Sequence, residues 1–103
     1  MADQCRAAAL GSTGSDPVRT PHLDRLAAEG IVVRHAVSSY PVCSPHRAMF
    51  LTGMRPQVNG VTLNVNSETA QDGVGLRDGL PTWASVLRAQ GWRTGYIGKW
   101  HLE

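Results

Sequence analysis

Apolar side chains recur at the spacing of an amphipathic helix in two stretches of the chain, residues 20–30 and 82–91. Each stretch opens on a threonine that can cap a helix and closes on a glycine that can end one. The apolar faces consist of Leu23, Leu26 and Ala27 in the first stretch and of Trp83, Val86 and Leu87 in the second. The pattern therefore predicts two helices, each packing one face on a sheet.

Strand patterns follow or separate these helices. β-branched residues crowd residues 31–33 and 36–37, and residues 92–102 alternate bulky side chains with small or polar ones. A brief third strand is expected at residues 61–63, before a polar loop over residues 64–79. The switch between the two periodicities predicts the α/β fold class.

The stretch Cys43-Ser44-Pro45-His46-Arg47 opens a third predicted helix. Pro45 suits the first helical position and Gly53 the stop, so Cys43 is expected just outside the helix and Arg47 one turn inside it. Free N–H groups and the positive dipole end favour bound anions there. On these residues alone, a buried structural cysteine before an ordinary amphipathic helix is the favoured interpretation, because free cysteine is among the most buried residue types.

Other polar residues carry weaker signals. Lys99 and His101 lie two apart at the end of the last predicted strand, where they would project to one side as a cation beside an imidazole. A solvated strand terminus explains them as well. The pair Asp3-Gln4 reads as a solvated terminus, and His22 and His35 as ordinary surface histidines.

Composition excludes several classes of protein. The chain has 103 residues, 42% of them apolar, which suits one small domain. A net charge of +2 without a basic run argues against nucleic acid or a membrane as partner. The two cysteines form neither a disulfide framework nor a zinc spacing. Neither a signal peptide nor a membrane span is recognisable, so a soluble chain, cytoplasmic by default, is expected.

Two motifs carry a family resemblance. Cys-x-Pro-x-Arg followed by Leu-Thr-Gly, which starts at Cys43, closely resembles the first signature of the sulfatase family. Gly-x-x-Thr-Gly-Tyr-x-Gly-Lys-Trp-His-Leu resembles the second, with Trp92 where Tyr is common. The resemblance runs from Asp3 to Leu102. It implies a partial alkaline-phosphatase-like three-layer sandwich that lacks the first strand and the C-terminal half, so that residues 1–103 are an incomplete N-terminal part of a sulfatase domain.

The resemblance also implies a chemistry. Cys43 would be converted to formylglycine by a separate formylglycine-generating enzyme, and the hydrated aldehyde would attack the sulfur of a sulfated small molecule or carbohydrate. Arg47 and Lys99 would offset the negative charge, and His101 would accept a proton during sulfate release. Asp3 and Gln4, together with the modified Cys43, would bind Ca²⁺ or Mg²⁺.

Three alternatives stay open. A phosphonate or phosphate monoester hydrolase of the same superfamily can share these residues, and a truncated inactive product would carry them without activity. A cysteine phosphatase fits least, because its loop between the cysteine and the arginine is longer than the one from Cys43 to Arg47.

Overall fold

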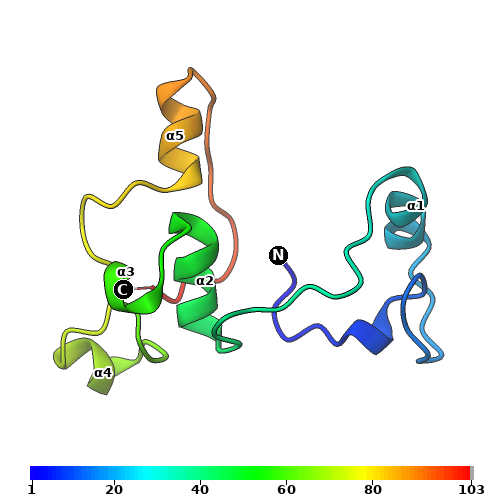
Figure 1. The fold of residues 1–103 in the computed structure, drawn as a ribbon, viewed down its shortest axis with the longest axis horizontal. Helices are drawn as coiled ribbons and strands as arrows, with labels where there is room; N and C mark the ends of the chain where they lie inside the picture. Colours follow the sequence, from blue (N-terminus) through cyan, green and yellow to red (C-terminus); the bar gives the residue numbers. More distant parts are fainter. Residues whose placement is uncertain (103) are drawn as a thin grey trace. The chain divides into compact units, whose positions relative to one another are not determined.

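The computed structural model describes residues 1–102 and consists of two compact units. The first unit, Met1–Val37, contains η1 (Ala7–Ala9) and α1 (Pro21–Glu29). The second begins at Ser38 and contains four helices (Figure 1). These helices are α2 (Cys43–Thr52), α3 (Pro56–Asn59), α4 (Ser67–Gln71) and α5 (Trp83–Ala89).

The first unit confirms the predicted helix but not its cap. α1 begins at Pro21 and is followed by Gly30, as expected. The Thr20 side chain makes no capping hydrogen bond. Its hydroxyl instead donates to Asp24 Oδ1 at 2.9 Å and accepts from the Gly11 backbone N–H at 2.8 Å. The hydroxyl therefore ties the preceding loop to α1, because a tertiary partner competes with the cap.

The predicted strands are wrong for the part of the chain that the structure describes. Residues 31–33, 61–63 and 92–102 form no strand, and residues 1–102 are helical or irregular throughout. Apolar side chains in two of these segments are fully open to solvent, with exposed fractions of 93% for Ile31 and 102% for Ile97. A strand needs hydrogen bonds to a neighbouring strand, and no such ladder exists within residues 1–102, so β-branched composition alone does not produce one.

A small apolar core holds the second unit together. It is built from one face of α2, the segment after α3 and the C-terminal segment, which runs back past α2 in Figure 1. Its buried members are Ala48, Leu51, Val61, Val65 and Leu102. The Leu76 backbone N–H donates to the Leu102 carbonyl at 3.1 Å. The core thus places the second motif beside the helix that carries the first.

α2 starts two residues earlier than the sequence predicts. Its first residue is Cys43, so Cys43 lies inside the helix, and Pro45 occupies the third helical position. Proline is tolerated there because the N–H groups of the first turn have no partner within the helix. The predicted end is confirmed, because Gly53 adopts the left-handed φ of +68° and its N–H donates to the Met49 carbonyl at 2.8 Å.

Two short helices, α3 and α4, lie between α2 and α5, and α4 occupies part of the stretch predicted to be a polar loop. α3 is a single turn that ends at Gly60. α4 begins with a capping box between Asn66 and Thr69. The sequence does not reveal this box, because threonine takes the place of the usual Glu or Gln.

The helix predicted over residues 82–90 is confirmed as α5. Thr82 caps it by accepting from the Ser85 N–H at 3.0 Å. Trp83 is 49% exposed and meets Phe50 of α2 edge to face, with ring centroids 6.1 Å apart. This aromatic pair joins α5 to α2.

No helix within residues 1–102 has both the length and the apolar character needed to cross a membrane.

Candidate active site

Cys43 and Arg47 lie one helical turn apart on α2. Residues four apart on a helix share a face, so the two side chains lie on the same side of α2. Cys43 is partly buried, whereas the Arg47 side chain is only 5% exposed. Burying an arginine costs free energy unless its N–H donors find acceptors. The acceptors that the Arg47 side chain contacts therefore determine how this residue is held.

Arg47 reaches across to the C-terminal segment. Its Nη1 donates to the Lys99 backbone carbonyl at 2.6 Å and lies 3.4 Å from the Tyr96 hydroxyl. The Tyr96 hydroxyl in turn donates to the same Lys99 carbonyl. One guanidinium, one phenol and one carbonyl therefore form a closed triangle. The triangle joins the helix of the first motif to the segment of the second.

The backbone of the second motif is irregular. The prediction that Lys99 and His101 project to one side of a strand is therefore wrong. Gly98 has φ +115° and His101 has φ +60°. Positive φ is uncommon for a residue with a side chain. At Gly98 and His101 the backbone turns sharply, and Leu102 lies in the core with 2% of its surface exposed. His101 is partly buried, and its Nδ1 is buried with no hydrogen-bond partner in the part of the chain described.

Asp3 and Gln4 belong to the first unit, and Cys43 to the second. Asp3 and Gln4 both lie in an exposed turn, and Gln4 has φ +54°. A carboxylate and an amide oxygen are donors that suit Ca²⁺ or Mg²⁺, so their chemistry fits the expected cation. Within residues 1–102 no cluster of three or more His, Cys, Asp or Glu side chains is assembled. These two residues alone therefore do not complete a metal site.

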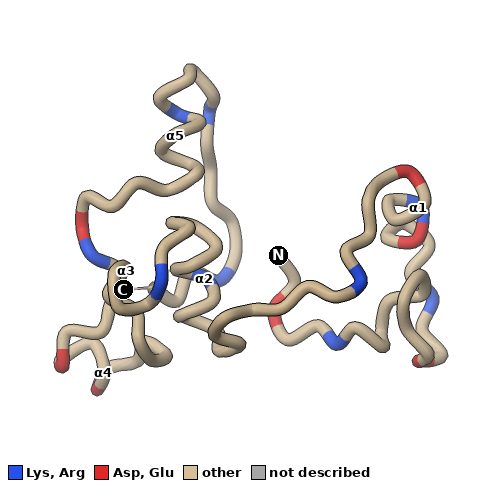
Figure 2. The backbone as a smooth tube through the Cα atoms, viewed as in Figure 1, with Lys and Arg blue, Asp and Glu red and all other residues tan. Residues whose placement is uncertain are grey.

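Charge in the second unit is unevenly distributed. Figure 2 shows Asp and Glu on α4 and both signs of charge in the loop that follows it, whereas the charged residues of α2, α5 and the C-terminal segment 92–102 are all Lys or Arg. The Arg47 and Lys99 positions therefore meet in a basic neighbourhood. Such a neighbourhood favours an anionic ligand.

The turn before α2 is tied to the first motif. The Ser38 hydroxyl lies 2.8 Å from His46 Nδ1 and accepts from the Tyr40 N–H at 3.3 Å. The Val42 N–H donates to the Tyr40 carbonyl at 2.9 Å. The turn over residues 38–41 therefore leads by way of Val42 into Cys43.

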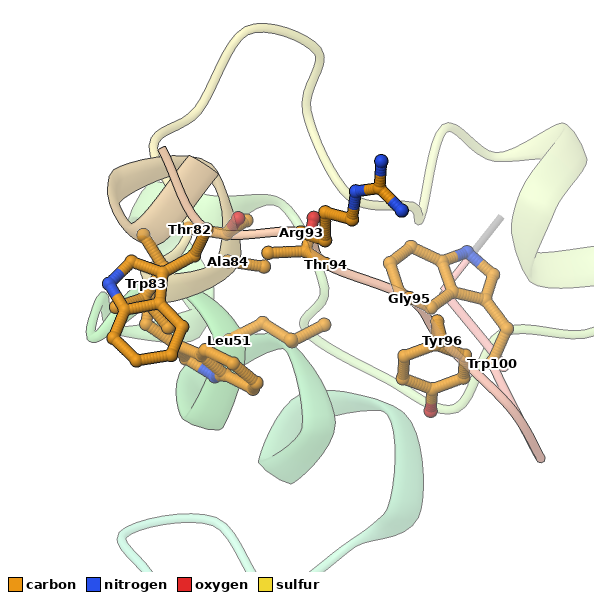
Figure 3. Close-up of a pocket in the computed structure, with 11 residues that line it drawn as sticks. Leu51, Thr82, Trp83, Ala84, Arg93, Thr94, Gly95, Tyr96 and Trp100 are labelled. Atoms are coloured by element: carbon orange, nitrogen blue, oxygen red, sulfur yellow. The ribbon is translucent and has the colours of Figure 1, made fainter. Parts of the chain in front are cut away.

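An apolar pocket of about 400 Å³ lies between α5 and the C-terminal segment. Figure 3 shows Trp83 at one end and Tyr96 with Trp100 at the other, with Leu51 between them. Neither Cys43 nor Arg47 lines it. Tyr96 belongs to both features, because its ring lines the pocket and its hydroxyl contacts Arg47.

The motifs identify Cys43, Arg47, Lys99 and His101, and the structure brings Arg47 to Lys99 directly. Tyr96 was not predicted as a site residue, since a tyrosine in an alternating segment has the same pattern as any half-buried aromatic. Asn64 and Ser44 were also missed. Their contacts, described below, join residues 20 positions apart that no spacing rule connects.

Comparison with known proteins gives one consistent result. The whole chain, residues 1–103, matches the family described as Sulfatase. An ulvan-active sulfatase from Formosa agariphila is 44% identical over 103 residues, which are 100% of this chain and 19% of that protein. A steryl-sulfatase from Rattus norvegicus is 42% identical over 106 residues, covering 99% of this chain and 18% of that protein.

A solved structure supports the same assignment. The crystal structure of a proposed sulfatase from Bacteroides fragilis superposes with a TM-score of 0.91 at 55% identity, covering 98% of this chain and 22% of that one. The chain thus spans about a fifth of the length of these relatives. A match of the family along the whole chain, with both signature motifs present and joined through Arg47, shows that this chain belongs to the sulfatase family.

Proposed function

We propose that this chain supplies the nucleophile and two of the cationic groups of a sulfatase active site, which hydrolyses sulfate monoesters. The observation that carries the proposal is the 2.6 Å hydrogen bond from Arg47 Nη1 to the Lys99 carbonyl. It joins the helix that starts with Cys43 to the segment that contains Lys99 and His101. The overall reaction consumes one water, breaks the S–O bond to the organic group and yields an alcohol and sulfate.

The residues of this chain have separate roles in that reaction. Arg47 is held by the Lys99 carbonyl and the Tyr96 hydroxyl, and its positive charge offsets the repulsion between the sulfate oxygens and an attacking oxygen. Lys99 adds a second cation from the opposite segment. His101 would accept and return a proton, and the buried Nδ1 restricts exchange with solvent to its other nitrogen.

One modification and one ion have to be supplied from outside the chain. A formylglycine-generating enzyme, which supplies the oxidant, would convert the Cys43 side chain to an aldehyde with loss of its sulfur, and the hydrated aldehyde would provide the oxygen that attacks the sulfur of the substrate. A divalent cation, Ca²⁺ or Mg²⁺, would polarise the sulfate, and Asp3, Gln4 and the modified Cys43 are the residues of this chain that would contribute to holding it. Oxygen donors at Asp3 and Gln4 support this assignment.

The chain corresponds to only part of each relative. The chain matches about a fifth of each relative. Because its two motifs resemble the first and second signatures of the family, we infer that residues 1–103 correspond to the N-terminal part of a sulfatase domain with an alkaline-phosphatase-like three-layer sandwich. The exposed apolar residues at positions 31 and 97 fit segments that pair with neighbours in such a sandwich. For a site that hydrolyses sulfate monoesters, the expected substrate is a sulfated small molecule or carbohydrate.

A chimera tests the proposal. The 103 residues matched in the Formosa agariphila sulfatase would be replaced by this chain and expressed together with a formylglycine-generating enzyme. The chimera is expected to hydrolyse an aryl sulfate, and Cys43→Ala is expected to abolish that activity. Cys5→Ala is the matched control, because Cys5 is exposed and lies outside both motifs. Equal activity of Cys43→Ala and the unsubstituted chimera would contradict the proposal.

A further inference from the structure

The first turn of α2, which contains Cys43, has an unusual cap. Val42 precedes the helix, and its aliphatic side chain makes no capping hydrogen bond. A helix start normally needs a side-chain oxygen to accept from the N–H groups of the first turn. The local sequence therefore does not supply the cap that this helix requires.

The missing acceptor comes from 20 residues away. Asn64 Oδ1 accepts a hydrogen bond from the Ser44 backbone N–H at 3.0 Å. The Val42 N–H already donates to the Tyr40 carbonyl at 2.9 Å, and Pro45 has no N–H. Asn64 thus satisfies a donor that the adjoining residues leave without an acceptor.

The contact is reciprocal. The Ser44 hydroxyl accepts from the Val65 N–H at 3.1 Å, so Ser44 donates to one residue of the 64–65 segment and accepts from the next. Ser44 is completely buried, and Val65 is 3% exposed and part of the core. Water cannot replace either bond at a buried position without cost. This pair of bonds is called the Ser44–Asn64 clamp below.

We propose that Asn64 is a positioning residue for Cys43, acting as a long-range cap that fixes the first turn of α2. This role rests on the proposed function only in that Cys43 is taken as the precursor of the nucleophile. Cys43 is the residue immediately before Ser44, so fixing the Ser44 N–H fixes the peptide plane that joins the two residues. The clamp also anchors the helix start to the core, because Val65 is one of the core residues.

The clamp can be tested on the 103-residue chain without any activity assay. In the isotope-labelled parental chain, a through-hydrogen-bond coupling is expected between the Ser44 nitrogen and the side-chain carbonyl carbon of Asn64. Absence of this coupling, together with unprotected exchange of the Ser44 amide, would overturn the proposal. This arm does not depend on whether any variant folds.

Substitutions then separate capping from general stability. Asn64→Ala is expected to speed hydrogen exchange at the Ser44 amide about fivefold, the factor that corresponds to a typical lost cap. Asn64→Asp keeps an acceptor oxygen at the same place and is expected to restore slow exchange. The matched control is Asn66→Ala, because Asn66 caps α4 with the same chemistry two residues further on. It should speed exchange at Glu68 and Thr69 and leave Ser44 unchanged.

The thiol gives a second readout. Alkylation of partly buried Cys43, measured relative to exposed Cys5 in the same chain, is expected to rise about fivefold in Asn64→Ala and to return to the parental ratio in Asn64→Asp. An unchanged ratio in Asn64→Ala, or failure of Asn64→Asp to restore it, would show that Asn64 does not position Cys43. In the chimera, Asn64→Ala should lower kcat with little change in KM. The exchange and alkylation outcomes are independent of the proposed function, because they hold even if the chimera has no activity.

Discussion

The Arg47 guanidinium donates to the backbone carbonyl of Lys99 at 2.6 Å, although the two residues are 52 positions apart. The bond uses the side chain of Arg47 but only the backbone of Lys99. Any side chain at position 99 therefore leaves the bond in place, whereas most substitutions at position 47 remove it. The two cations of the proposed site should consequently differ in what their loss does to the protein.

The first prediction follows from this asymmetry. In the chimera, Lys99→Ala is expected to lower the turnover of an aryl sulfate about 10²- to 10³-fold, the usual effect of losing one preorganised group that meets developing charge. Its melting temperature should fall less than that of Arg47→Ala, because the hydrogen bond from Arg47 to the Lys99 carbonyl remains. Arg47→Ala should lower both turnover and stability, the latter by about 1–3 kcal/mol, because a buried charge-assisted hydrogen bond is lost. Steady-state kinetics and thermal melts measure the two effects.

Two histidines provide the controls for these variants. His22 and His35 are exposed, in or near α1 and outside both motifs. His22→Ala and His35→Ala should keep turnover within a few-fold of the parental chimera. Near-parental turnover of Lys99→Ala, or His35→Ala as the most damaging change, would refute the assignment of the site.

A second prediction concerns the Tyr96 hydroxyl, which touches both Arg47 Nη1 and the Lys99 carbonyl. Tyr96→Phe removes only that oxygen and keeps the ring that packs edge to face against Trp100 at 5.0 Å. The substitution removes the hydrogen bonds of the hydroxyl to the Arg47 guanidinium and to the Lys99 carbonyl, which should cost about 1–3 kcal/mol and lower kcat at least severalfold. Trp100→Phe, which changes the ring partner and keeps the hydroxyl, is the comparison. If both variants lower kcat equally, the hydroxyl has no separate role.

A third prediction uses two glycines with similar backbone angles. Gly60 has φ +93° and Gly73 has φ +80°, so an alanine at either position pays about 1–2 kcal/mol for the left-handed backbone. Only at Gly60 would the added methyl also lie 2.6 Å from the carbonyl oxygen of Gly75, whereas nothing lies within 4 Å of it at Gly73. In the chimera, Gly60→Ala should therefore melt at a clearly lower temperature than Gly73→Ala. Equal melting temperatures would show that the 60–75 contact is absent in solution.

The helices of this chain could be predicted from sequence because each carries local signals. Pro21, the pair of Thr82 with Gly91, and Gly53 marked three helices whose identity the structure confirms. The start of α2 could not be predicted, because its cap is Asn64 and not a neighbour of Cys43. Likewise, residues 31–33 have strand composition but no strand partner among the residues described, and pairing is not a local property.

The residue types of the candidate site stay a prediction from the two motifs, whereas the contacts among them could not be predicted. The motifs identify Cys43, Arg47, Lys99 and His101, and Arg47 does meet the segment of the second motif. The contact itself runs to a backbone carbonyl and a tyrosine hydroxyl, neither of which composition distinguishes. Asp3 and Gln4 stay a prediction for the metal site, since they belong to a different unit from Cys43.

A fourth prediction concerns the stability of the 103-residue chain by itself. Within residues 1–102 the buried apolar core has five members, and several large apolar side chains, including Ile31, Val37 and Ile97, are at least nine-tenths exposed. Little apolar area is then removed from water, so stability should be marginal. Circular dichroism should show a weak, broad transition. A sharp transition above about 65 °C, beyond the usual range for mesophile domains, would contradict this expectation.

The most direct test of the central claim is the chemical state of Cys43 after expression with a formylglycine-generating enzyme. The claim predicts that peptide mass spectrometry finds the aldehyde at Cys43, that an aldehyde-selective reagent labels that peptide, and that Cys5 in the same molecules remains a thiol. Arg47→Ala, which breaks the Cys-x-Pro-x-Arg motif, should reduce the modified fraction. An unmodified thiol at Cys43 in every molecule, while a control sulfatase in the same cells is converted, would contradict the account.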